Sequence, residues 1–290
     1  MLLAAASCHA ADLKIDHVTA AGADLKQLQA KLQAAGIPSV YGGPHTNRAT
    51  EMALVSFPDG SYLELLGIQP NADANAVAKY EWSAFLRGDA GPCAWAVRER
   101  NLPAEVARLR SVGVKVSEPV PGGRRRPDGV QLQWQTSNIG EETRGVFFPF
   151  AIQDVTPRDR RAYPQGKPVT REFRGVARVV IAVRDLDRAV KRYREAFGLP
   201  EALKQVDTEF GAQLAMLGGS PVVLAAPLNA DSWLSGRLER FGEAPCAFIL
   251  AAADMNKNMK KWKTVSKTRW FGVETAWLDV GWRLGIEPAR

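Results

Sequence analysis

Four stretches of the chain repeat one order of hydrophobic and polar positions: a short apolar run, a segment of helical period, a glycine, and further alternating runs. In the first stretch, residues 15–20 predict a strand, and Asp24 is a good N-cap for the helix that follows. Gly36 suits the position after a helix end. Pro58-Asp59-Gly60 predicts a tight turn between two further strands. The stretch therefore predicts a β-α-β-β-β unit.

The same order returns at residues 93–113 and 179–198, and more weakly from residue 246, where the predicted helix (255–262) is short and rich in lysine. Residues 92–97 also resemble residues 245–250, so the second half is predicted to repeat the first. We therefore predict an α+β fold of four β-α-β-β-β units in two tandem domains. The expected boundaries are 11–155 for the first domain, 156–173 for a linker, and 174–290 for the second domain, whose second unit is truncated.

Composition narrows the class of protein without changing this picture. Hydrophobic residues make up 46% and charged residues 24% of the 290 residues, as in globular proteins. No apolar run is long enough to span a bilayer. The net charge is +7, but the basic residues are scattered, and their densest clusters (124–126, 158–161 and 257–263) are interpreted as solvated loops. No nucleic-acid motif accompanies them, so a nucleic-acid partner is not expected.

Residues 1–10 carry no Lys, Arg, Asp or Glu and end in small residues. They resemble the end of a secretory signal peptide, and we interpret them as its remnant. The mature protein would then be periplasmic or secreted; if the resemblance is accidental, it is cytoplasmic. Cleavage would leave two cysteines, Cys93 and Cys246, and two histidines, His17 and His45.

Several motifs resemble the vicinal oxygen chelate superfamily, the fold of glyoxalases and extradiol dioxygenases. They are Asp16-His17-Val18, Gly42-Gly43-Pro44-His45, the segment 59–65 (DGSYLEL) and the segment 178–187 (RVVIAVRDLD). The first half is most similar to the group called glyoxalase-like domains, which the segment 123–129 (GRRRPDG) also resembles. The resemblance implies two glyoxalase-like domains, in each of which two units pair into a cup.

The resemblance also implies a divalent metal held by residues of the first and fourth strands. His17 and Glu64 stand at these positions, and His45 would be a third ligand or a proton-transfer residue, so that Glu64 and His45 are also the catalytic candidates. Such ligands suit Zn²⁺, Fe²⁺, Mn²⁺ or Ni²⁺, and no other cofactor is expected. The alternative is a hydrogen-bonded strand histidine with a glutamate at the rim.

The other units depart from this pattern. Trp95 and Phe150 stand at the expected ligand positions of the second unit and cannot bind metal. In the second domain Arg178 and Val223 take the places of the histidine and glutamate, so we expect that domain to be metal-free and structural or ligand-binding. Arg178 could anchor an anion in the cup, but we favour an ordinary surface residue.

Substrate contacts are expected from a loop and from aromatic residues. Arg124 and Arg126 lie in a segment that could close over the first cup and hold a carboxylate bidentately. Trp134, Trp95 and Phe148 could line an apolar pocket. The alternatives are a solvated hairpin for the arginines and core positions for the aromatic residues.

Three functions stay open at this point. The first is a metal-dependent enzyme, a lyase, isomerase or dioxygenase, acting on a small oxygen-rich metabolite, with or without a carboxylate. The second is a metal-free protein that sequesters a small molecule in an aromatic cup, and the third is a structural module with a degenerate cup. A small-molecule ligand is the expected partner, and a homodimer is left open.

Overall fold

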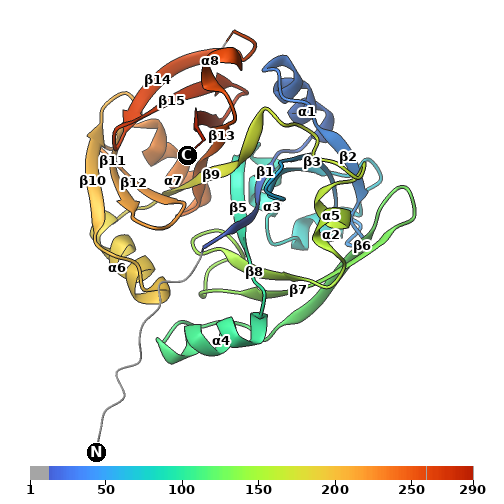
Figure 1. Ribbon diagram of the computed structural model, residues 1–290. Helices are drawn as coiled ribbons and strands as arrows, with labels where there is room; N and C mark the ends of the chain where they lie inside the picture. The colour runs from blue at the N-terminus through green and yellow to red at the C-terminus, as the bar shows by residue number, and fades with distance from the viewer. Residues whose placement is uncertain (1–12, 259, 290) are drawn as a thin grey trace, which may run out of the picture.

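The computed structural model describes residues 13–258 and 260–289, which form two curled sheets of eight strands each (Figure 1). The first sheet contains, in chain order, β1 (Ile15–Ala21), β2 (Val40–Pro44), β3 (Thr50–Ser56), β4 (Tyr62–Ile68), β5 (Gly91–Arg98), β6 (Val120–Arg125), β7 (Gln131–Asn138) and β8 (Phe150–Asp154). The second contains β9 (Phe173–Ala182), β10 (Ala202–Asp207), β11 (Ala212–Leu217), β12 (Val222–Pro227), β13 (Pro245–Ala252), β14 (Thr264–Trp270), β15 (Val273–Asp279) and β16 (Arg283–Pro288).

Both sheets have the same topology. The first sheet runs β2-β3-β4-β1-β5-β8-β7-β6 and the second β10-β11-β12-β9-β13-β16-β15-β14. The first strands of two units pair antiparallel at the centre, and each has the fourth strand of its own unit parallel beside it. The predicted α+β fold of four β-α-β-β-β units is therefore confirmed.

The helices are α1 (Leu25–Ala34), α2 (Ala74–Lys79), α3 (Ser83–Arg87), α4 (Leu102–Ser111), α5 (Arg158–Ala162), α6 (Leu186–Phe197), α7 (Trp233–Phe241) and α8 (Met255–Asn258). Asp24 accepts hydrogen bonds from backbone N–H groups at the start of α1, as predicted, and Asn101 and Asp185 do the same at the starts of α4 and α6. The helix of the fourth unit, α8, is shorter than predicted.

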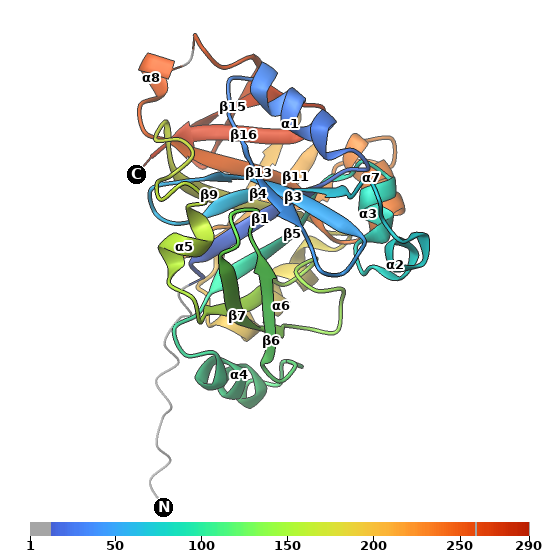
Figure 2. The same cartoon turned by 90° about the vertical axis from the view of Figure 1, so that its right-hand side faces the viewer.

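The two faces of each sheet have different roles. One face carries Val18 and Val97 in the first sheet and Val179 and Phe248 in the second, all buried in one core that the two halves and their helices share. The opposite, concave faces carry separate clusters of buried residues and line two cups. The two sheets pack against each other, with β5 next to β13 and β1 next to β9 (Figure 2). Aromatic side chains, among them Phe210, fill the second cup.

A register shift interrupts β1 between Ile15 and His17, where it pairs with β5. It turns Ile15 to the shared core, whereas His17 lines the first cup. Regular strand alternation would have placed both residues on one face, and the register shift explains why only His17 points into the cup. β9 pairs with β13 through the same shift, between Val176 and Arg178.

Cys93 and Cys246 are buried free thiols. No helix among the described residues is long and apolar enough to cross a membrane. The interpreted signal remnant, residues 1–10, lies outside the described part of the chain.

Candidate functional site

The concave face of the first sheet encloses a pocket of about 340 Å³. His17 from β1, Glu64 from β4 and His45 from the loop after β2 all line it, as do Arg124 from β6 and Trp134 from β7. Residues as far apart in the chain as His17 and Arg161 thus line one pocket because the sheet curls around it.

His45 and Glu64 lie at the centre of a chain of polar contacts. His45 Nε2 is 3.9 Å from Glu64 Oε1, and the Thr19 hydroxyl donates to Glu64 Oε2 over 2.9 Å. On the other side, His45 Nδ1 is 2.9 Å from the hydroxyl of Thr50, which accepts a hydrogen bond from the Asn47 amide. The Thr50 hydroxyl can therefore donate to Nδ1, which places the ring proton on Nε2, facing Glu64.

Burial lowers the pKa of His45 below its ordinary value, against the opposing effect of Glu64 and with the help of Arg124 and Arg144. The ring is therefore neutral at pH 7. A neutral His45 with its proton on Nε2 is a hydrogen-bond donor next to a carboxylate.

His17 is held from behind by Asp16, which is fully buried. Its Nδ1 donates to Asp16 Oδ1 over 2.6 Å, and its ring stacks on Tyr62 with centroids 4.8 Å apart. The ring of Phe150 meets it edge-on at 5.4 Å. These contacts fix the ring plane at the floor of the pocket.

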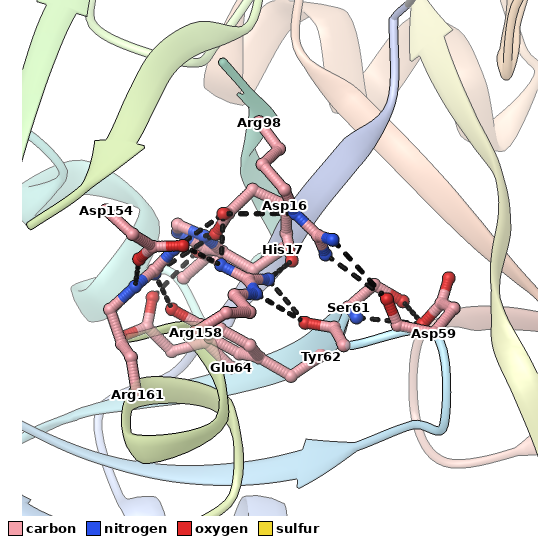
Figure 3. A network of polar contacts seen from close by, with 12 residues as sticks. Asp16, His17, Asp59, Ser61, Tyr62, Glu64, Arg98, Asp154, Arg158 and Arg161 are labelled. Atoms are coloured by element: carbon pink, nitrogen blue, oxygen red, sulfur yellow. Dashed lines mark hydrogen bonds and ion pairs between the residues drawn. The ribbon is translucent and has the colours of Figure 1, made fainter. Parts of the chain in front are cut away.

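Two arginines of α5 neutralise Asp16 (Figure 3). Arg161 Nη2 lies 2.6 Å from Asp16 Oδ2, and Arg158 bonds the same oxygen. Burial alone would raise the pKa of Asp16, but Arg161, Arg158 and His17 hold it well below its ordinary value. The cluster 158–161 was expected to be a solvated loop; instead Arg161 is 3% exposed, because its charge is paired inside the protein.

Arg161 also bonds Asp154 and the Tyr62 hydroxyl, so its donors are occupied. Of the arginines that line the pocket, Arg124 and Arg144 have N–H groups that are not hydrogen-bonded within the described part of the chain. Arg124 is 6% exposed and gives one hydrogen bond, to the carbonyl of Gly42 over 2.6 Å.

Arg144 lies over the rings of Trp82 and Phe150, at 5.5 and 5.1 Å from their centroids. One of its terminal nitrogens bonds Glu81, and its buried Nε has no partner among the described residues. In the described part of the chain, Arg124 therefore brings an unpaired positive charge to the pocket, and Arg144, although paired with Glu81, keeps an N–H group without a partner, so both can bind an anion.

The predicted metal ligands meet in this pocket but do not form a ligand set. In the described part of the chain, no three His, Cys, Asp or Glu side chains are arranged to hold a metal ion. His17 is stacked on Tyr62 and bonded to Asp16, while His45 and Glu64 form a separate pair. The residues present do not fit the three-ligand metal site that the resemblance implied.

The predicted substrate contacts divide into two groups. Arg124 and Trp134 line the pocket. Trp95 and Phe148 are buried in the shared core instead, because on β5 it is Ala94 and Ala96 that face the cup.

Arg126 does not line the pocket either. It bonds the Asp128 carboxylate and the carbonyl groups of Arg160 and Pro164, which ties the β6–β7 turn to α5. The loop that carries it is therefore anchored beside the cup.

Sequence reasoning missed Arg144, Trp82 and Arg161. Arg144 lies in irregular chain between β7 and β8, so no periodicity marked it. Tyr62 carried a signal, since it alternates with Glu64 along β4 and must share its face.

In the second domain, Arg178 is 7% exposed and donates to Glu287 Oε2 over 2.8 Å. It is therefore a buried member of an ion pair between β9 and β16, and the expectation of a surface residue was wrong. Glu287, on the last strand, was not recognised from the sequence.

Two curled sheets of paired β-α-β-β-β units define a protein of the vicinal oxygen chelate class. Within that class the chain belongs to the glyoxalase-like domain family, whose model matches residues 15–197. No curated protein matches the sequence.

Solved structures share the fold over nearly the whole chain. A hypothetical protein from Staphylococcus aureus is 17% identical, with a TM-score of 0.63 over 95% of this chain and 99% of that chain. A triple mutant of 4-hydroxymandelate synthase from Streptomyces coelicolor is 13% identical, with a TM-score of 0.62 over 96% of this chain and 94% of that chain. At these identities the likeness concerns the fold alone.

Proposed function

We propose that the first cup binds a small carboxylated metabolite and that Glu64 and His45 move a proton on it, as in an isomerase or a lyase. One observation carries this proposal: the pocket combines two guanidinium groups that have free donors with a His–Glu pair whose facing atoms are 3.9 Å apart. A volume of about 340 Å³ lies near the lower end of the range for small-molecule pockets, which favours a small metabolite.

Binding of the carboxylate is assigned to Arg124 and Arg144. A guanidinium offers two parallel N–H groups that match the two oxygens of a carboxylate. Arg144 already lies over the rings of Trp82 and Phe150 and bonds Glu81, so little side-chain freedom is lost when an anion binds. Trp134 and Phe150 supply apolar surface for the rest of the ligand.

The chemical step needs a base that removes a proton from a substrate carbon and a hydrogen-bond donor to the neighbouring carbonyl oxygen. Glu64 takes the proton from a carbon next to a carbonyl, and the electron pair of the C–H bond moves onto the carbonyl oxygen. His45 Nε2–H donates to that oxygen as its negative charge develops. Return of the proton to the carbon completes an isomerisation, whereas loss of a leaving group from the neighbouring carbon completes an elimination.

The test is deuterium exchange. The protein is incubated in D₂O with a panel of 2-oxo, 2-hydroxy and dicarboxylic acids, and NMR follows loss of the carbon-bound proton, while calorimetry measures binding. Glu64→Gln is expected to slow exchange by about 100-fold or more with little change in affinity. Arg144→Gln is expected to weaken binding about tenfold or more, the loss of a charge-assisted pair.

Glu51→Gln is the matched control, because Glu51 is also buried but accepts from Tyr41 and does not line the pocket. Binding of no carboxylate, or exchange that Glu64→Gln leaves unchanged, contradicts the proposal. Elemental mass spectrometry of the protein after incubation with Zn²⁺, Fe²⁺, Mn²⁺ or Ni²⁺ belongs to the same experiment. If the wild-type protein binds stoichiometric metal and a His45→Ala/Glu64→Ala variant does not, the proposal is contradicted. The protein would then be interpreted as a metal-dependent enzyme.

The aromatic walls favour a second function, a protein that sequesters its ligand. Trp82, Trp134 and Phe150 surround the pocket with flat apolar surface, which suits binding without chemistry. Tight binding of a panel member without any exchange in the wild-type protein would support this second function.

A further inference from the structure

A second and larger hollow, of about 590 Å³, lies where the two halves of the protein meet. Helix α7, the start of β13 and the turn between β15 and β16 form most of its wall. Residues 88–90, which precede β5 in the first half, close the remaining side. This hollow is separate from the proposed active site and shares no lining residue with it.

Arg283 brings to the hollow a guanidinium that has no ion-pair partner among the described residues, although the carboxylates of Asp89 and Asp279 also line the hollow. Its guanidinium lies over the rings of Trp233 and Phe210, 5.0 and 5.9 Å from their centroids. The described residues include no carboxylate paired with it. Asp279, its cross-strand neighbour, is paired with Lys263 at 2.5 Å instead. Arg283 is thus held in place by aromatic rings, with its N–H groups available to an anion.

Two further arginines line the hollow. Arg237 donates to the carbonyl groups of Ala90, Pro92 and Pro245 and so links β5 of one half to β13 of the other. Arg240 donates to the carbonyl of Gly88 over 3.0 Å. Carbonyl groups carry only partial charge, so both arginines add to the positive potential of the hollow.

The walls of the hollow are flat and aromatic. Trp282 packs directly on Gly91, where an added Cβ would lie 2.6 Å from the tryptophan side chain. Phe241 lies beneath the guanidinium groups of Arg237 and Arg240, at 5.2 and 4.9 Å. Cys246 also lines the hollow, but burial raises the pKa of its thiol to about 12, so it stays a neutral, unreactive group.

We propose that this hollow is a second ligand site that takes an aromatic carboxylate. The carboxylate pairs with Arg283, and the ring packs against the aromatic walls that Trp282 and Phe241 provide. Such a ligand touches both halves of the protein and strengthens their junction. The site goes beyond the proposed function of the first cup and does not depend on it.

The test uses 1-naphthoate as the probe, with 1-naphthalenemethanol as its uncharged counterpart and sulfate as an anion without a ring. NMR follows the indole N–H signals of the ¹⁵N-labelled full-length protein, assigned with Trp233→Phe and Trp282→Phe. We expect saturable shifts of the Trp282 and Trp233 signals with 1-naphthoate, and binding of the alcohol and of sulfate at least about tenfold weaker.

Two variants locate the charge that binds the probe. Arg283→Gln is expected to weaken 1-naphthoate binding about tenfold or more, the value of one charge-assisted pair. Arg188→Gln on α6 removes the same charge from an exposed position and is expected to change the affinity by less than about twofold, because solvent screens a distant charge. Arg144→Gln, in the first cup, is expected to leave the Trp282 titration unchanged.

The proposal is overturned if 1-naphthoate produces no saturable shift of Trp282 or Trp233 in the wild-type protein. It is also overturned if the alcohol binds as tightly as the acid, or if Arg283→Gln binds like the wild type. If Arg283→Gln does not fold, Arg283→Lys is used, which keeps the charge. The comparison of the acid with the alcohol needs only the wild-type protein and then tests the proposal by itself. The signals of Trp82 and Trp134 report ligand binding in the first cup separately. Failure of the proposed function of that cup is therefore distinguishable from failure of the second ligand site.

Discussion

At the scale of single residues, Asp16 is the group on which the floor of the first cup depends. It is fully buried and bonds Arg158, Arg161 and His17 at once. Asp16→Asn keeps the shape but removes the charge, so Arg161 keeps only Asp154 as a carboxylate partner. We expect the free energy of unfolding at pH 7 to fall by about 3 kcal/mol, as for a broken buried ion pair.

Urea unfolding monitored by tryptophan fluorescence measures this loss. Asp187→Asn is the control, because Asp187 is paired with Lys204 on the surface and its side chain is 80% exposed. The control is expected to stay within about 0.5 kcal/mol of the wild type. Equal losses in the two variants would contradict the role assigned to Asp16.

Acid sensitivity follows from the same carboxyl. The pKa of Asp16 in the folded protein is held well below the value of about 3.9 for an unfolded aspartate. A depressed folded pKa contributes stability that is fully present above the unfolded value and is lost as the pH falls toward the folded value. Asp16→Asn lacks this contribution at every pH.

The difference in unfolding free energy between wild type and Asp16→Asn should therefore shrink as the pH is lowered from about 5 to about 2.5. Urea titrations at four pH values across this window measure it. A difference that stays constant over the window would show that the variant acts through packing and not through charge.

At the scale of elements, the sequence predicted what periodicity and capping residues determine. The strands of the first unit and the helices behind Asp24, Asn101 and Asp185 were predictable, because each has an apolar period and a polar start. His17, His45 and Glu64 were also predicted to lie close together, and they line one pocket.

What the sequence left open has a physical reason in each case. Helix α5 has no apolar period, because its inward side chains are Arg161, which is buried, and Arg158, which is half-buried, and both are ion-paired with Asp16 and Asp154. Trp95 was placed in the cup, but strand alternation on β5 turns it into the core. Such facts depend on partners distant in sequence, which a local pattern does not contain.

Two glycines, one on β4 and one on α7, differ in the space that is available for an added side chain. On β4, a Cβ added to Gly67 would lie 2.6–2.9 Å from Leu25, including its backbone, where α1 begins. On α7, a Cβ added to Gly236 meets nothing within 4 Å.

Gly67→Ala is therefore expected to cost about 1–3 kcal/mol, since neither element can yield. Gly236→Ala is expected to stabilise the protein by about 0.5–1 kcal/mol, because alanine is the better helix former. Thermal unfolding of both variants measures the two shifts. The same direction of change in both would contradict the packing described for α1 on β4.

At the scale of the whole molecule, the two halves form one core. Phe148 of the first half meets Tyr193 and Phe197 of α6 at ring distances of 4.9 and 5.5 Å. The Tyr193 hydroxyl donates to the carbonyl of Phe147, and Arg237 links β5 to β13. A half on its own would therefore expose a large apolar face to water.

This arrangement predicts that the protein unfolds in one cooperative transition, in spite of its tandem design. Tyr193→Ala removes a fully buried aromatic ring from the junction and is expected to cost about 3–5 kcal/mol. Because the core is shared, this substitution should lower the melting temperature of both halves together.

Tyr41→Ala is the control, since Tyr41 is 44% exposed and its loss is expected to cost less than about 1 kcal/mol. Calorimetry combined with the indole N–H signals of Trp82 and Trp277, one in each half, measures the outcome. Two separate transitions, or a variant in which only the Trp277 signal melts early, would show that the halves are stable on their own and that the shared core contributes little to either.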